Sequence, residues 1–176
     1  METKYFYVVV DMVDRKLGIS YDAWKSPMTF WRPDCAIGDC FRVKSPSGWS
    51  EEVRRERLFE HRNMLVKKVE ISKLYEMVLP LTEKGNSKQF LYAIWDRNKE
   101  EMLLLYMHLP LFFSKEMADK QFKRLTGKRS WKKEFRKEKL AEYKNIELCK
   151  INRTALFELL NHSLSVGKKE KIKNRL

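Results

Sequence analysis

The densest group of side chains that could bind a ligand is basic and lies in the second half of the chain. Between Lys115 and Lys144 there are twelve lysine or arginine residues and five acidic ones. Lysine and arginine are the side chains that contact nucleic-acid phosphates, and such an excess exceeds what neighbouring carboxylates can pair. We therefore expect a phosphate-contacting surface here, formed by Lys123, Arg124, Lys128, Arg129, Lys132, Lys133, Arg136 and Lys137.

Two further basic groups extend this prediction to other parts of the chain. The first half has Arg54, Arg55 and Arg62 in a helix-forming stretch, where pairing with glutamates at helical spacing is the competing explanation. The tail Gly167–Leu176 has five basic residues and one acid, and Lys168 and Lys169 are its first two cations. We expect this tail to be flexible unless a polyanion orders it.

Aromatic residues lie among these charges, and aromatic rings beside arginine are typical of single-stranded nucleic-acid sites. The Phe30-Trp31-Arg32-Pro33 segment lies in a region with loop-like composition, so Trp31 and Arg32 are the stacking candidates. Trp49 and Trp131 precede the two charged helices and are better explained as core residues.

The whole composition agrees with an anionic partner. The chain of 176 residues has 37 Lys+Arg against 24 Asp+Glu, a net charge of +13, and 43% hydrophobic residues, enough for a packed core. We expect a non-enzymatic nucleic-acid-binding protein, with RNA or single-stranded DNA favoured over duplex. The alternative is a small inhibitor or regulator that docks on an acidic protein surface.

The sequence predicts no metal site and no cofactor. Cys35 and Cys40 are the closest cysteine pair, and no second Cys or His pair with zinc-site spacing accompanies them. The chain also lacks a phosphate-binding glycine loop and a nucleophile elbow. The three cysteines fit a reducing intracellular compartment, cytoplasmic or nuclear, and we expect no signal peptide or membrane span.

A metal-dependent nuclease is the second alternative. Tyr5-Phe6-Tyr7 followed by Lys16-Leu17-Gly18-Ile19-Ser20 resembles the opening of GIY-YIG nucleases. That resemblance implies a tyrosine such as Tyr7 acting with a helical glutamate, Glu52 or Glu56. The chain departs from the family pattern because Lys16 replaces the second tyrosine and the helical arginine is missing, so we assign no catalytic residue.

The elements that carry these side chains form a repeating pattern. The stretch Trp49–Val66 aligns with Trp131–Leu148 without a gap, which is typical of a tandem duplication. Asp14-Arg15 and Asp96-Arg97 keep the same offset in the predicted turns before each stretch. The identical pairs within the stretch are Trp49/Trp131, Glu52/Glu134, Arg54/Arg136, Glu56/Glu138, Leu58/Leu140, Glu60/Glu142 and Asn63/Asn145.

The local patterns predict the same elements in each half. In the first half these are a hairpin opening with strand 4–13, a Gly- and Pro-rich segment with a short strand at 41–43, a helix at 51–61, a strand at 64–71 and a helix at 73–81. In the second half they are a hairpin of 89–95 and 102–107, a segment capped by Ser114, a charged helix, a strand at 146–151, and a helix at 153–166 capped by Asn152.

The predicted fold class is therefore α+β. We expect two diverged tandem repeats of about 82 residues, each a β-hairpin followed by helix, strand and helix, packed as one compact unit. The first repeat is assigned to residues 1–82, the second to 83–166, and the basic tail to 167–176.

Overall fold

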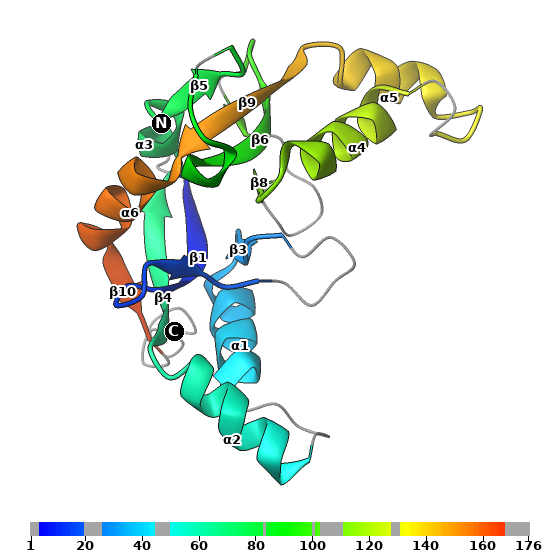
Figure 1. The fold of residues 1–176 in the computed structure, drawn as a ribbon. Coiled ribbons are helices and arrows are strands. Elements are labelled where there is room, and N and C mark those ends of the chain that lie inside the picture. Colours follow the sequence, from blue (N-terminus) through cyan, green and yellow to red (C-terminus); the bar gives the residue numbers. More distant parts are fainter. Residues whose placement is uncertain are drawn as a thin grey trace, which may run out of the picture. The chain divides into compact units, whose positions relative to one another are not determined.

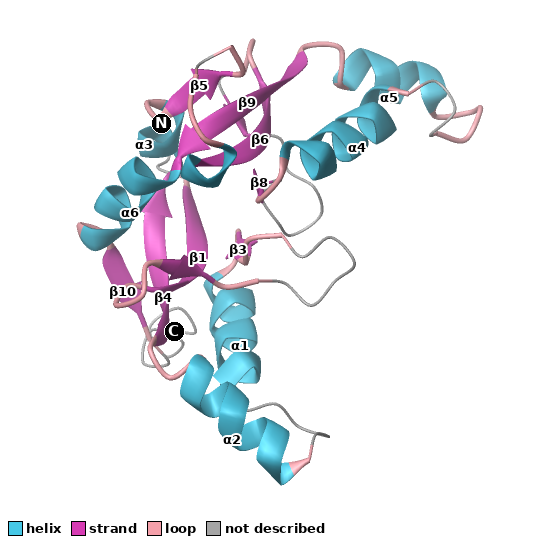
Figure 2. Cartoon of the chain, in the orientation of Figure 1, coloured by secondary structure: helices cyan, strands magenta, loops and turns pink. Residues whose placement is uncertain are grey.

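The computed structural model describes residues 4–19, 26–44, 50–82, 84–99, 101–102, 111–127 and 131–167. The fold is α+β, with two antiparallel sheets and six α-helices in these residues (Figures 1 and 2). The contacts between residues divide the chain into two compact units. The first unit comprises residues 1–73 and 157–176, and the second comprises residues 74–156.

The sheet of the first unit is built around a long hydrophobic strand, and its order is β10-β4-β1-β2, with β3 also pairing with β1. The central pair β1 and β4 is antiparallel along its whole length, from Tyr5 opposite Glu70 to Asp11 opposite Met64. Strand β1 has the sequence YFYVVVD, and such a continuous apolar run is typical of a strand covered on both faces. The strand bounds are β1 Tyr5–Asp11, β2 Lys16–Leu17, β3 Thr29–Phe30, β4 Met64–Glu70 and β10 Leu164–Val166.

Helix α1, Pro33–Lys44, covers one part of this sheet. Ala36 and Cys40 are one helical turn apart, so they lie on one face of the helix, and both join a buried cluster that includes Val9, Phe30 and Met64. Helix α2, Glu51–Glu60, follows and contacts α1. The chain passes to the second unit within the short helix α3, Ile71–Tyr75, and returns within α6, Arg153–Asn161.

The sheet of the second unit has the order β5-β9-β6-β7, with β8 also pairing with β6. Its central pair is again antiparallel along its whole length, from Phe90 opposite Asn152 to Asp96 opposite Ile146. A 3-10 turn, Ser87–Gln89, leads into β6. The strand bounds are β5 Val78–Pro80, β6 Phe90–Asp96, β7 Glu101–Met102, β8 Leu111–Phe112 and β9 Ile146–Asn152.

Helix α4, Lys115–Thr126, packs on the second sheet, and helix α5, Arg136–Glu142, packs against α4. Helix α4 begins at Ser114, whose hydroxyl accepts a hydrogen bond from the Met117 backbone N–H and so confirms the predicted cap. Helix α5 is shorter than the charged helix expected from the repeat. Ala118 and Leu125 of α4 are buried in a cluster with Tyr92, Ile94, Phe112, Tyr143 and Ile146.

Three secondary-structure predictions are wrong. The strand expected at 41–43 is the last part of helix α1, because the buried residues of this segment recur at helical spacing. The helix expected at 73–81 ends at Tyr75, and residues 78–80 pair with β9 instead. The helix expected at 153–166 is capped by Asn152 as predicted but ends at Asn161, after which residues 164–166 pair with β4. Strand pairing outweighs helix propensity in the last two cases.

Two further predictions fall mostly on residues that the structure does not describe. The strand expected at 102–107 is described only at Met102, which pairs with Trp95 of β6. The basic tail is described only at Gly167, and Trp49 also lies outside the described residues.

Candidate nucleic-acid interface

The predicted basic residues fall into three groups in the structure. Those on α4, on α5 and at Lys132 and Lys133 belong to the second unit, and Arg32, Arg55 and Arg62 belong to the first. Residues Lys128, Arg129, Lys168 and Lys169 lie outside the described residues, as does the side chain of Arg54. The remaining cations differ in whether they form hydrogen bonds or ion pairs within the protein.

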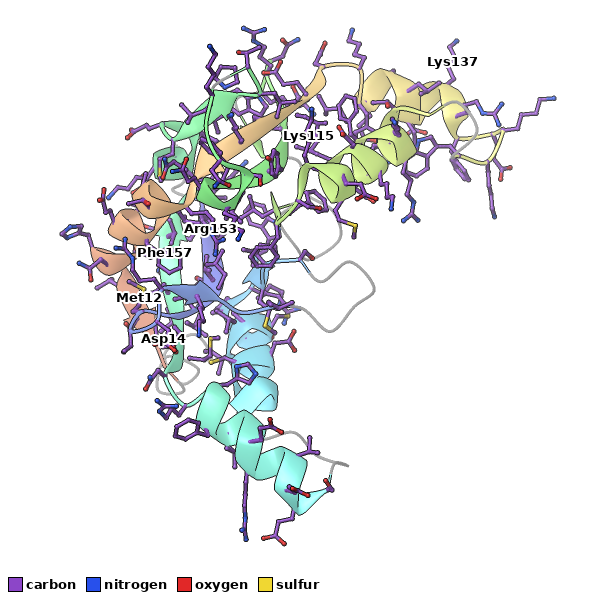
Figure 3. All side chains as sticks on the ribbon, in the orientation of Figure 1. Met12, Asp14, Lys115, Lys137, Arg153 and Phe157 are labelled. Carbon is purple, nitrogen blue, oxygen red and sulfur yellow. The ribbon has the colours of Figure 1, made fainter. Side chains whose placement is uncertain are left out.

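Five cations of the second unit are exposed and have no acidic partner in the described part of the chain. Lys123 and Arg124 lie in the last turn of α4, where the negative end of the helix dipole favours basic side chains. The others are Lys132 and Lys133, which precede α5, and Lys137 on α5, whose side chain extends away from the ribbon in Figure 3. We call these five residues the basic α4–α5 surface.

Trp131 joins the end of α4 to the segment before α5. Its Nε1 donates a hydrogen bond to the backbone oxygen of Leu125 across 3.2 Å, and the side chain packs against the buried cluster of the second unit. Its ring stacks on that of Tyr143, with centroids 5.9 Å apart. Trp131 is therefore partly buried against the core rather than within it, and its contacts link the end of α4 to the segment before α5.

Arg136 differs from its basic neighbours because its side chain forms a hydrogen bond within the protein. Its Nη2 donates to the backbone oxygen of Trp131 at 3.3 Å, and the side chain is only partly exposed. Its Nε is buried without a hydrogen-bond partner in the described residues. Arg136 thus positions the start of α5, and we leave it out of the basic α4–α5 surface.

Two more lysines of the second unit are neutralised by helical neighbours. Lys120 Nζ lies 2.9 Å from Glu116, and this contact holds the pKa of the Glu116 carboxyl below its usual value. Lys139 Nζ lies 2.6 Å from Glu142, whose hydrogen bond raises the pKa of Lys139. Lys139 also lies over the rings of Trp131 and Tyr143. Such pairs are the alternative explanation for charged helices, and here it applies to these two lysines.

Two candidate arginines of the first unit have partners. Arg55 Nη2 contacts Glu51 Oε1 at 2.5 Å, and Arg62 Nη1 donates to the backbone oxygen of Phe59 at 2.6 Å. The Arg62 guanidinium also lies 4.0 Å from the centre of the Phe59 ring. Both arginines are therefore held in local contacts, in contrast to the basic α4–α5 surface.

The loop-like segment proposed for stacking is divided between two environments. Phe30 is buried in the core of the first unit, so its ring is unavailable to a ligand. Arg32 makes two hydrogen bonds to Asp34, at 3.0 and 2.6 Å, and this pairing lowers the pKa of Asp34 and raises that of Arg32. Trp31 is partly buried, and its Nε1 has no hydrogen-bond partner among the described residues.

The residues considered for metal or nuclease chemistry do not form a metal-binding group. Within the described residues, no group of three or more His, Cys, Asp or Glu side chains is arranged to hold a metal ion. Tyr7 packs against the buried cluster of the first unit, whereas Glu52 and Glu56 are exposed on α2. Cys40 and Cys149 are buried cysteines, and Cys35 is partly exposed.

One exposed side chain of the region is absent from the sequence prediction. Phe135 lies between Lys133 and Lys137 and is 51% exposed, although its alignment with Val53 marks it as an apolar position of a packed helix. An open depression in the surface is lined by Lys132, Lys133 and Glu134, immediately before it in the chain. The signal available in the sequence was an aromatic residue flanked on both sides by basic ones.

Comparisons with protein families, with curated proteins and with solved structures find no match for this chain. No helix in the described residues is long and apolar enough to span a lipid bilayer. Function must therefore be inferred from the chemistry of the site itself.

Proposed function

We propose that the protein binds nucleic acid through the basic α4–α5 surface. The observation that supports this proposal is that Lys123, Arg124, Lys132, Lys133 and Lys137 are exposed and unpaired among the described residues, whereas Lys120 and Lys139 next to them are paired. Unpaired cations on one surface repel one another, and a row of phosphates relieves that repulsion. The net charge of +13 acts in the same direction over longer distances.

The proposal predicts binding with a steep dependence on salt. Contacts from five cations to five phosphates release about five counterions, so the logarithm of the affinity should fall with the logarithm of salt with a slope of about −3.5 to −4.5. Between 50 and 200 mM salt, this slope corresponds to a loss of affinity of roughly 100- to 500-fold. Fluorescence anisotropy with a labelled random oligonucleotide measures this affinity at each salt concentration. No binding at low salt, or binding that does not weaken as salt is added, would contradict the proposal.

An acidic protein surface would attract the same cations, so the binding experiment includes a competitor. Polyglutamate presents carboxylates at high density without phosphates or bases. If nucleic acid is the ligand, an oligonucleotide should displace bound polyglutamate at matched charge, because phosphate contacts are joined by contacts to sugar and base. Displacement in the opposite order would favour the inhibitor or regulator alternative.

We also propose that the chain arose by tandem duplication. Two sets of matched contacts and one set of matched buried residues support this proposal. The first involves Asp11 and Asp96, which are both buried at the end of a central strand. Asp11 Oδ1 accepts hydrogen bonds from the backbone N–H groups of Val13 and Asp14, at 2.8 and 2.9 Å. Asp96 Oδ1 accepts from the equivalent N–H groups after it, at 3.0 and 3.2 Å. Asp11, rather than the expected Asp14, is thus the counterpart of Asp96.

The second set is a lysine lying over an aromatic ring in each sheet. Lys68 Nζ is 4.2 Å from the centre of the Tyr5 ring, and Lys150 Nζ is 4.1 Å from that of Phe90. The strand partners of the two lysines also correspond, since Lys68 lies opposite Tyr7 and Lys150 opposite Tyr92.

The third set is the composition of the two buried clusters. Strand β1 matches β6 with the offset that relates Asp11 to Asp96, whereas β3 to β4 match β8 to β9 with the smaller offset that relates Trp49 to Trp131. A connection between β2 and β3 that is slightly longer than its counterpart between β7 and β8 accounts for the change. On this proposal the two repeats are residues 1–82 and 83–166. The matched pairs are Val9/Ile94, Phe30/Phe112, Ala36/Ala118, Cys40/Phe122, Met64/Ile146, Val66/Leu148 and Val166/Leu81.

A further inference from the structure

Phe135 occupies a position in the basic α4–α5 surface that neither the core nor the helix requires. It is the N-cap residue of α5, yet it supplies no side-chain hydrogen bond to the free N–H groups of the first turn. Serine, threonine, aspartate and asparagine are the residues that stabilise this position. Half of the Phe135 side chain is exposed, so the fold gains little from an aromatic residue here.

The backbone around Phe135 is nevertheless well fixed. Its N–H donates to the Lys132 oxygen at 3.0 Å, and its own oxygen accepts from the Lys139 N–H at 3.0 Å. The ring therefore projects from a defined turn, and cations of the basic α4–α5 surface lie both before and after it in the chain. A rigid aromatic ring surrounded by cations is the arrangement that single-stranded nucleic acids use, since every base presents a face for stacking and the cations follow the backbone.

A second exposed phenylalanine provides a comparison within the same chain. Phe59 on α2 is 66% exposed, but the Arg62 guanidinium covers one face of its ring at 4.0 Å. Its neighbour one turn earlier, Arg55, is paired with Glu51. Exposure alone therefore does not single out Phe135; its position within the basic α4–α5 surface does.

We propose that Phe135 stacks on an unpaired base of a single-stranded nucleic acid whose phosphates are held by Lys132, Lys133 and Lys137. This inference rests on the proposed function and specifies its ligand class. Duplex DNA or RNA keeps its bases stacked on one another and offers no such face away from its ends, so it would use the lysines alone. The ring thus makes the site selective for single strands without reading a sequence.

The test compares Phe135→Ala with the parent protein, using a labelled single-stranded oligonucleotide and a duplex of equal length. Loss of one base stack should weaken single-strand binding by about 5- to 150-fold. Duplex binding and the slope against salt should stay unchanged, because no cation is removed. Phe135→Trp should retain single-strand affinity, and Phe59→Ala should behave as the parent. Thermal melts of all three variants should match the parent, since both side chains are exposed.

The outcomes separate this inference from the function on which it rests. If the parent binds neither oligonucleotide with a steep salt dependence, the proposed function fails and the inference fails with it. If the parent binds with the expected slope but Phe135→Ala keeps full single-strand affinity, nucleic-acid binding stands and stacking by Phe135 is excluded. Equal weakening of single-strand and duplex binding would likewise exclude stacking.

An independent observation concerns the last strand of each half of the chain. Strand β5 follows α3 in the first half but pairs with β9 of the second, placing Leu79 opposite Lys150. Strand β10 ends the second half but pairs with β4 of the first, placing Leu164 opposite Lys68. Lys67 Nζ also donates to the Ser163 oxygen at 2.9 Å. Each half therefore completes the sheet of the other.

We infer that this reciprocal strand exchange holds the two halves together without need of the covalent link between them. A cleavage sequence for a site-specific protease, inserted between Thr82 and Lys84, tests this because both residues are exposed. After complete cleavage, the two fragments should co-elute from a sizing column in native buffer at the position of the uncut protein. They should separate in denaturant.

A truncated chain without β10 tests whether the exchanged strand itself contributes to the association of the two fragments. Ending the protein after Ser163 removes β10, so the cleaved and truncated protein should release its fragments at a lower urea concentration than the cleaved full chain. Separation of the full-length fragments in native buffer would overturn the inference. Equal retention with and without β10 would overturn it as well, since the exchanged strand would then contribute nothing to association.

Discussion

The indole N–H of Trp131 donates a hydrogen bond to the carbonyl oxygen of Leu125 across 3.2 Å. This bond holds the segment before α5 against the last turn of α4. Leu125 is buried and belongs to the same cluster as Tyr143, on which Trp131 stacks. Trp131 thus supports the basic α4–α5 surface although it carries no charge. Its loss should weaken binding by destabilising the fold rather than by removing a contact to the ligand.

The first prediction separates the two roles of Trp131. Trp131→Phe keeps much of the packing and loses the hydrogen bond, so it should lower the free energy of unfolding by about 1 kcal/mol. Trp131→Ala also loses ring contacts and should cost about 3 kcal/mol. Urea denaturation measures both, and a Trp131→Ala transition identical to that of the parent would contradict the packing role.

The second prediction concerns the unpaired cations. Replacing Lys132, Lys133 and Lys137 together by glutamine should reduce the salt slope of oligonucleotide binding by about 2 to 3, because three phosphate contacts are lost. The melting temperature should not fall, since the structure gives these side chains no partner among the described residues. Anisotropy titrations at several salt concentrations and a thermal melt provide the two readouts.

Matched controls for this variant come from the paired cations. Arg55→Gln and Lys120→Gln remove a charge from a helix surface while leaving a glutamate behind, at Glu51 and Glu116. If these variants weaken binding as much per charge as the triple variant does, the net charge rather than the basic α4–α5 surface drives binding. Arg136 is unsuitable for such a test because its guanidinium also bonds to the Trp131 backbone.

The sequence predicted the positions of the long strands well because their apolar runs mark buried strands, but it did not predict that β1 pairs with β4 and β6 with β9. Strands β1, β4, β6 and β9 lie where the pattern placed them, and Ser114 and Asn152 cap helices as expected. Helix α1 was missed because glycine, proline and aromatics around it resemble a loop, although Ala36 and Cys40 recur at helical spacing. The short strands β5 and β10 have too few residues to show a period, and only long-range pairing defines them.

The candidate site was predictable as a region but not residue by residue. Arg55 and Lys137 are both basic residues on charged helices, and nothing local separates them, yet Arg55 has a glutamate partner and Lys137 has none in the described part of the chain. Whether a cation is free depends on rotamers and on neighbouring turns. Phe135 was missed for a related reason, since the repeat alignment marks a position as apolar without saying whether that copy is covered.

The third prediction uses the matched turns of the two halves. Asp11→Ala and Asp96→Ala each leave two backbone N–H groups without their aspartate acceptor, so each should lower the free energy of unfolding by about 1 to 3 kcal/mol. The asparagine variants should cost less, because the amide oxygen still accepts. Asp14→Ala should change stability by less than about 0.5 kcal/mol, because Asp14 is exposed and makes a 3.4 Å pair with Lys16.

Urea denaturation of these variants also tests the alignment of the two halves. Similar losses for Asp11 and Asp96 would support their equivalence. A large loss for Asp14 with none for Asp11 would restore the single constant offset between the halves and contradict the contacts that support the revised alignment.

The fourth prediction concerns the thiol of Cys149, which is buried in β9 with its sulfur 3.6 Å from the Ala93 oxygen. Burial, with a smaller contribution from the Glu147 carboxylate, raises the pKa of this thiol to about 12. Since the thiolate is the reactive form, Cys149 should resist a thiol reagent at pH 8 in the folded protein and react after unfolding. Mass spectrometry of the labelled peptide with and without urea would detect the difference.

The same shift sets the sign of a pH effect on stability. An unfolded cysteine ionises with a pKa near 8.5, whereas folded Cys149 keeps its proton to about pH 12. The folded state therefore binds the proton more tightly, so its contribution is complete below about pH 8.5 and is lost as the pH rises toward 12, by up to about 1.4 kcal/mol per pH unit. Cys149→Ala should be less stable than the parent at pH 7, because a buried group is removed, but the difference between the two should shrink above pH 9. A constant difference from pH 7 to pH 10.5 in urea titrations would show that the thiol ionises equally in both states and would contradict its burial.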